Sequence, residues 1–158
     1  MKQTYLTREG LKKLQGEQQA LLRQKRELTE EVSAAAAMGD LRENAEYHAA
    51  RERLQHVASR IAELDGKLQH VVLIDDLDIK DGEARVGTTV TLHEERAKEE
   101  FSYQLVGPDE ADPVSGKLSI ASPLGKALLG KTEGERVSVT LPNGMAAYRV
   151  VRIERTPS

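Results

Sequence analysis

The sequence contains no cysteine and no tryptophan, and its aromatic residues are limited to one Phe and four Tyr in 158 residues. Without cysteine, disulfide bonds, thiolate nucleophiles and cysteine-ligated zinc sites are excluded. Five aromatic side chains are too few to fill one large hydrophobic core. A charged fraction of 31% is typical of long solvated helices. The composition therefore favours two small domains.

Long apolar runs are also missing. No stretch approaches the ~20 apolar residues that a transmembrane helix needs. The first residues lead directly into an amphipathic pattern, unlike a signal peptide. We therefore expect a cytoplasmic protein without a membrane partner. The formal net charge of −3 argues against a general nucleic-acid-binding protein, which is usually basic, so any contact with nucleic acid should be local.

The common catalytic motifs are absent as well. The sequence has no phosphate-binding glycine loop, no Gly-x-Ser-x-Gly and no evident nucleophile beside a base. Of the four histidines, His48 and His56 share one predicted helix, but they are eight residues apart, too far for an i, i+4 metal pair. A histidine-ligated metal site is therefore not expected.

A seven-residue apolar repeat predicts two long helices in residues 1–75. The first should begin after Thr7, a good N-cap residue, and stop at Gly39, because glycine adopts positive φ at low steric cost. Its seam positions are Leu11, Leu14, Gln18, Leu21, Lys25, Leu28, Val32 and Ala35. Those of the second helix are Tyr47, Ala50, Leu54, Val57, Ile61, Leu64, Leu68 and Val71. Joined by a short turn, the two helices should form an antiparallel coiled-coil hairpin.

The turn of this hairpin, near residues 38–44, carries two carboxylates three residues apart. Asp40 is placed to cap the second helix, and Glu43 would complete an acidic version of the capping box. Ordinary capping explains both residues without a further function. Alternatively, they provide two oxygen ligands for a Mg²⁺ ion whose other ligands come from a partner. The architecture favours this alternative, because capping alone does not require a long stiff rod.

Three arginines, Arg42, Arg51 and Arg53, lie on or just below this tip. Guanidinium groups at such positions could contact the phosphates of a nucleic acid. Pairing with neighbouring side chains along the helix, or plain solvation, explains them at least as well. Their spacing alone leaves both interpretations open.

The apolar period changes from about 3.5 to 2 after residue 75, which predicts a second domain at residues 76–158. Strands are expected at residues 85–92, 100–106, 117–120, 136–141 and 146–154. Asn143-Gly144 should form the turn of the last hairpin. One short helix should begin at the Ser122-Pro123 cap and end after Leu129. The expected fold class is α+β, with a helical hairpin followed by a small, mostly antiparallel sheet with one helix.

A resemblance to a known family is carried by residues 39–52, which read Gly-Asp-Leu-Arg-Glu-Asn-Ala-Glu-Tyr-His-Ala-Ala-Arg-Glu. This segment closely resembles the coiled-coil tip of the bacterial GreA/GreB transcript cleavage factors, nearer to GreA. Residues 122–131, Ser-Pro-Leu-Gly-Lys-Ala-Leu-Leu-Gly-Lys, are a second match to that family. The resemblance extends over essentially the whole chain.

The resemblance implies that residues 76–158 have an FKBP-like fold and dock on bacterial RNA polymerase. The docking residues would be Ser122, Pro123, Leu124 and Gly125. The hairpin would enter the secondary channel of the polymerase, and the protein would act as a monomer. Its transcription-related function would be the rescue of arrested elongation complexes.

The tip residues acquire roles through the same resemblance. Asp40 and Glu43 would share a Mg²⁺ ion with the polymerase and promote hydrolysis of the backtracked transcript. Arg42 and Arg51 would contact the RNA near its 3′ end. The chain would therefore not be an enzyme on its own. Residues 34–37 lack the arginine that some members carry before the tip, which favours GreA-like action on short backtracked segments.

Three other functions are compatible with parts of the sequence. A family member that only inhibits the polymerase would enter the same channel, but such paralogues alter the tip, and Asp40 and Glu43 are both present here. A peptidyl-prolyl isomerase would need an aromatic pocket, and residues 76–158 contain only Phe101, Tyr103 and Tyr148. A coiled-coil chaperone would not depend on the tip carboxylates.

Overall fold

The computed structural model describes residues 3–39, 43–77 and 82–157. The chain divides into two compact units. Unit 1 comprises Met1–Gln3 and Glu9–Val71, and unit 2 comprises Thr4–Arg8 and Val72–Ser158. Unit 2 therefore includes a short N-terminal segment that the sequence analysis placed in the coiled coil.

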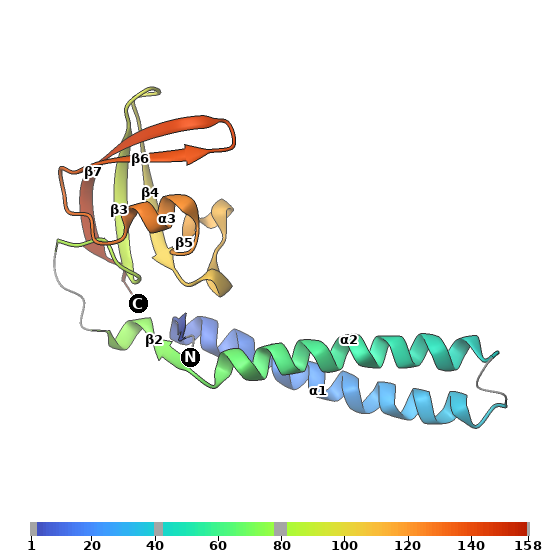
Figure 1. The fold of residues 1–158 in the computed structure, drawn as a ribbon. Coiled ribbons are helices and arrows are strands. Elements are labelled where there is room, and N and C mark those ends of the chain that lie inside the picture. Colours follow the sequence, from blue (N-terminus) through green and yellow to red (C-terminus); the bar gives the residue numbers. More distant parts are fainter. Residues whose placement is uncertain (1–2, 40–42, 78–81, 158) are drawn as a thin grey trace. The chain divides into compact units, whose positions relative to one another are not determined.

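Unit 1 is a hairpin of two long helices, α1 (Arg8–Ala36) and α2 (Ala45–Leu68), which lie side by side (Figure 1). The apolar side chains buried along these helices all occupy predicted seam positions. They are Leu14, Ala35, Ala50, Ile61 and Leu64. Within the described residues, neither of these helices nor any other is long and apolar enough to cross a membrane.

Polar pairs between the two helices confirm that they are antiparallel. Arg60 donates to Glu17 near the start of α1 at 2.9 Å, whereas Arg53 donates to Glu31 near its end at 3.0 Å. The hydrogen bond to Glu17, followed by that to Glu63, raises the pKa of Arg60. Because the side chains of both pairs remain accessible to solvent, the pairs contribute little stability, and the apolar seam supplies most of it.

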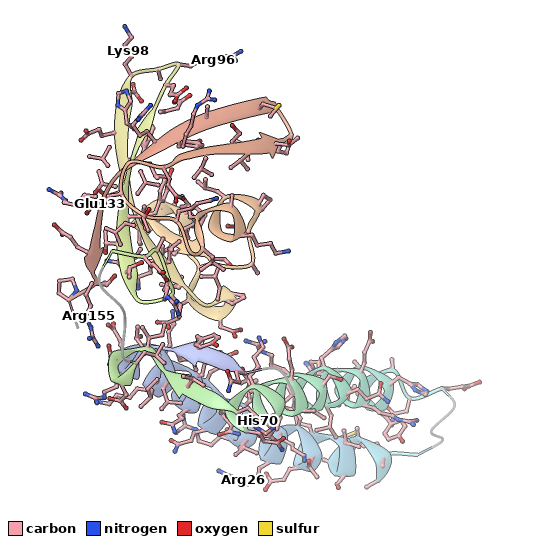
Figure 2. The ribbon with its side chains drawn as sticks, turned by 60° about the vertical axis from the view of Figure 1, so that its left-hand side comes forward. Arg26, His70, Arg96, Lys98, Glu133 and Arg155 are labelled. Atoms are coloured by element: carbon pink, nitrogen blue, oxygen red, sulfur yellow. The ribbon has the colours of Figure 1, made fainter. Side chains whose placement is uncertain are left out.

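Unit 2 contains a five-stranded sheet with the strand order β5-β4-β3-β7-β6 (Figure 1). Its strands are β3 (Thr88–Glu94), β4 (Glu99–Val106), β5 (Lys117–Ser119), β6 (Arg136–Leu141) and β7 (Gly144–Arg155). Neighbouring strands are antiparallel except β4 and β5, which are parallel. Figure 2 shows Arg96 and Lys98 projecting from the turn between β3 and β4. Each of the five strands was predicted, and the α+β fold class is confirmed.

The helix α3 (Pro123–Leu128) packs against β6, and the hydrophobic core of unit 2 lies between this helix and one face of the sheet. Its buried members are Ala84, Val90, Leu92, Leu105, Leu124, Leu128, Val137, Val139 and Val150. Tyr103 and Tyr148 pack against this core, and burial raises the pKa of Tyr148. Short 3-10 helices occupy Ile74–Asp76, Pro108–Glu110 and Pro113–Ser115.

The sequence did not predict a second, two-stranded sheet formed by β1 (Thr4–Leu6) and β2 (Val71–Leu73). After β1, the helix α1 begins directly after Thr7, as predicted.

The start of α1 is bound by two carboxylates of unit 2. The backbone N–H of Thr7 donates to Oε2 of Glu110 at 2.8 Å, and its hydroxyl donates to Oε1 at 2.6 Å. The N–H of Arg8 donates to Asp75 at 3.0 Å. Two carboxylates thus accept from N–H groups at a helix start, where partners within the helix are lacking.

Replacing Glu110 by Ala should lower the free energy of unfolding by about 1–3 kcal/mol, the usual effect of losing hydrogen bonds to a charged group. Equilibrium urea unfolding would measure this change. Glu30→Ala, which removes an exposed carboxylate from α1, serves as the control and should change the free energy by less than about 0.5 kcal/mol. Equal stabilities of the two variants would show that the contact between Thr7 and Glu110 contributes nothing.

Candidate functional site

The tip of the hairpin, residues 37–44, joins the end of α1 to the start of α2. The last turn of α1 closes with hydrogen bonds from the N–H of Ala37 to the carbonyl of Ser33 and from the N–H of Met38 to that of Ala35. Gly39 has a φ of +137°, which favours glycine. The predicted positive φ at Gly39 is confirmed, and α1 ends three residues before this glycine, at Ala36.

The second helix begins later than predicted. Its N-cap is Asn44, in extended conformation, and the side-chain Oδ1 accepts the N–H of Tyr47 at 3.0 Å. The prediction of Asp40 as N-cap, with Glu43 in the third helical position, is therefore wrong. Asparagine caps a helix as well as aspartate does, and a start at Ala45 places Glu43 before the helix. The capping box thus does not explain why an acidic residue is present at position 43.

Glu43 is exposed at this tip, immediately before the cap. Asp40 and Arg42, the other tip residues expected to be functional, lie outside the described residues. Arg51 is exposed on α2, roughly 9 Å further along the helix axis than Ala45 at ~1.5 Å per residue. The neighbouring Arg53 forms an ion pair with Glu31, so pairing explains this arginine. Figure 2 shows Arg26 on α1 pointing away from α2.

One tip residue was missed by the sequence analysis. Besides capping α2, the side chain of Asn44 donates its Nδ2 hydrogen to the carbonyl of Ala35 in α1, at 2.6 Å. Asn44 is thus bonded to both helices. Asparagine is a preferred N-cap residue and stands directly before a helical pattern, so the sequence could have indicated the cap. No local pattern indicates the bond to Ala35.

The predicted docking residues surround the start of α3. The hydroxyl of Ser122 accepts the N–H of Gly125 at 3.1 Å and donates to the carbonyl of Ser119 at 2.6 Å. Leu124 belongs to the hydrophobic core and is 9% exposed. Pro123 is exposed. Of the four residues, Pro123 is therefore the one best placed for direct contact with a partner.

Gly125 has a structural reason to be glycine. A Cβ atom at this position would lie 2.0 Å from the carbonyl oxygen of Ser119 and 2.9 Å from Oγ of Ser122. The turn that carries the Ser122 cap is therefore packed directly against the backbone of Gly125. Ser122, Leu124 and Gly125 together hold Pro123 in place.

The chemistry of the tip suits a magnesium ion. Mg²⁺ prefers carboxylate and water oxygens, and it is usually bound through one or two carboxylates plus a partner's oxygens. Glu43 offers such a carboxylate, and its exposure makes it accessible. Within residues 3–39, 43–77 and 82–157, no group of three or more His, Asp or Glu side chains could hold a metal ion.

Comparison with known proteins covers both units. Residues 4–73 match the family model described as "Transcription elongation factor, N-terminal", and residues 79–155 match "Transcription elongation factor, GreA/GreB, C-term".

Individual relatives match over nearly the whole chain. Transcription elongation factor GreA of Caldanaerobacter subterraneus subsp. tengcongensis is 44% identical over 155 residues, covering 98% of this chain and 99% of the relative. GreA of Pseudomonas putida is 42% identical, covering 94% of each chain. The solved structure of GreA factor homolog 1 from Thermus thermophilus is 29% identical, covering 97% of this chain and 99% of that one, with a TM-score of 0.45.

Proposed function

The chain belongs to the GreA/GreB family of transcription elongation factors, and from this membership we infer that it acts on bacterial RNA polymerase during elongation. We propose more specifically that it enters the secondary channel and stimulates hydrolysis of backtracked transcripts by the polymerase. In this role the chain supplies ligands and is not an enzyme on its own. It acts as a monomer.

The observation that carries this proposal is the exposed carboxylate of Glu43 at the end of a two-helix rod. The 29 residues of α1 give a helix roughly 43 Å long at ~1.5 Å per residue. Because Asn44 rather than an acidic residue caps α2, the carboxylate of Glu43 is available for another role. A narrow rod with an available carboxylate at its end is suited to reaching a buried active centre.

In the proposed mechanism, Asp40 and Glu43 would hold a Mg²⁺ ion together with carboxylates of the polymerase. When bound, this ion supplies electrostatic stabilisation of the phosphoryl oxygens and lowers the pKa of a coordinated water. Glu43 would contribute a negatively charged oxygen ligand and would help to orient the attacking water. Arg42 and Arg51 bind phosphates of the RNA 3′ segment, which holds the scissile phosphate near the carboxylates.

The direct test adds the purified protein and Mg²⁺ to stalled, backtracked elongation complexes and follows the release of short 3′ RNA fragments. The proposal predicts release that is much faster than by polymerase alone, followed by resumed synthesis. An inhibitor that enters the same channel would instead slow elongation without releasing fragments. That result would contradict the proposed function.

Docking should depend on Pro123, which is exposed at the start of α3. Pro123→Ala is expected to raise the concentration needed to compete for polymerase by about 5- to 10-fold, because truncating an energetically important interface residue costs ~1 kcal/mol or more. The competition assay uses a labelled copy of the unmodified protein. Pro142→Ala, at another exposed proline of unit 2, is the matched control. If both variants compete equally well for polymerase, Pro123 does not contribute to docking.

A further inference from the structure

Asn44 connects the two helices of unit 1 at the tip through the two ends of its side-chain amide. Oδ1 accepts the N–H of Tyr47 within α2 at 3.0 Å, and Nδ2 donates to the carbonyl of Ala35 within α1 at 2.6 Å. A carbonyl can only accept and a backbone N–H can only donate, so both partners require the same orientation of the amide. The side chain is half-buried, and Ala35 is only 5% exposed.

The carbonyl of Ala35 needs partners from outside the helix. The last four carbonyls of a helix have no N–H partner within that helix. Because α1 ends at Ala36, the carbonyl of Ala35 is one of them. The carbonyl of Ala35 accepts the N–H of Met38 at 3.1 Å in addition to the amide of Asn44. Asn44 thus donates a hydrogen bond to a carbonyl at the end of α1 and also caps the start of α2.

This arrangement restricts where the backbone of Glu43 lies. Consecutive Cα atoms are about 3.8 Å apart, so the position of Asn44 restricts that of Glu43 directly. A bond from Asn44 to α2 alone would fix Glu43 relative to the second helix only. The additional bond to Ala35 fixes it relative to both. Ligands must be held to within about 0.5 Å for productive metal-assisted chemistry, so bonds that restrict Glu43 relative to both helices matter for its role as a ligand.

We propose that Asn44 is a positioning residue, which holds the carboxylate of Glu43 in its working position by donating its amide to Ala35. The proposal rests on the proposed function, because the working position is the one that Glu43 takes in the polymerase. It concerns the geometry of the tip and not the docking of unit 2. Loss of the amide should therefore impair cleavage without impairing binding.

The two hydrogen bonds of Asn44 can be separated by substitution. Serine and aspartate are as good as asparagine at a helix N-cap, so both preserve the bond to Tyr47. Neither offers a donor at the position of the amide Nδ2. Asp has the same length but only acceptor oxygens when ionised, and Ser is shorter by one atom. Asn44→Asp removes the donor without shortening the side chain, and Asn44→Ser replaces the amide by a hydroxyl one atom closer to the backbone without adding charge.

The experiment measures three quantities for each variant: helicity by circular dichroism, competition with the unmodified protein for polymerase, and the maximal rate of RNA fragment release at saturating factor. Asn143→Ser, the same substitution in the β6–β7 turn of unit 2, is the matched control. We expect both Asn44 variants to reduce the maximal rate by about 10-fold, the lower end of what outer-shell partners of metal ligands contribute. Helicity and competition should equal those of the control.

Two results would overturn the positioning role. In one, both Asn44 variants cleave within about 2-fold of Asn143→Ser. In the other, competition falls in parallel with cleavage, which would indicate general damage to the rod. Failure of the proposed function itself looks different, because the unmodified protein would then release no fragments.

Discussion

Glu43→Gln should reduce stimulated transcript cleavage by about 100-fold or more while leaving competition for polymerase unchanged. The substitution keeps the size of the side chain and removes its charge, so it weakens a Mg²⁺ ligand without disturbing the tip. Mutating even outer-shell partners of metal ligands typically costs ~10- to 100-fold, and removing a ligand should cost at least as much. The rate of RNA fragment release at saturating factor measures this effect.

Glu46→Gln provides the matched control for this prediction. Glu46 is an exposed carboxylate in the first turn of α2, three residues beyond Glu43. Its neutralisation should change the cleavage rate by less than about 2-fold. If the two variants are equally impaired, general negative charge at the tip is sufficient and Glu43 has no individual role. Asp40→Asn is expected to behave like Glu43→Gln.

Leu124→Ala should destabilise unit 2 by about 2–5 kcal/mol, the range found for large-to-small substitutions in hydrophobic cores. Leu124 is 9% exposed and contributes to the cluster between α3 and the sheet. Its truncation leaves a cavity that the surrounding strands cannot fill completely. Equilibrium urea unfolding, followed by a probe in unit 2, measures the loss.

Lys126→Ala is the control, because Lys126 is exposed on the same helix and alanine is a good helix former. It should change the free energy of unfolding by less than about 0.5 kcal/mol. A loss of polymerase competition by Leu124→Ala would then follow from unfolding. If Leu124→Ala is as stable as Lys126→Ala and still fails to compete, Leu124 must contact the polymerase directly.

The long helices and the strands could be predicted because their patterns repeat. A seam that recurs every seven residues identifies which side chains are buried, and Leu14, Ile61 and Leu64 are buried as that pattern requires. The strands of unit 2 follow the alternation of buried and exposed positions, as in Arg136–Leu141. These signals are local and redundant, so a single irregular residue such as Lys25 does not obscure them.

The tip and the N-terminal segment could not be predicted in the same way. Asp40 and Asn44 are both good N-cap residues by type, and the bond from Asn44 to Ala35, nine residues away, has no local sequence signal. The contact between Thr7 and Glu110 spans 103 residues of sequence. The three residues of β1 directly precede the helical pattern of α1, and no local pattern indicates their pairing with β2.

The central claim is that Glu43 supplies a ligand for a Mg²⁺ ion shared with the polymerase, and the Mg²⁺ dependence of transcript cleavage tests it most directly. The rate of fragment release is measured over a range of Mg²⁺ concentrations for polymerase alone, with the unmodified protein, and with Glu43→Gln. The account predicts that the unmodified protein lowers the half-saturating Mg²⁺ concentration and that Glu43→Gln lowers it much less. An identical half-saturating concentration in all three cases would contradict a shared metal ion.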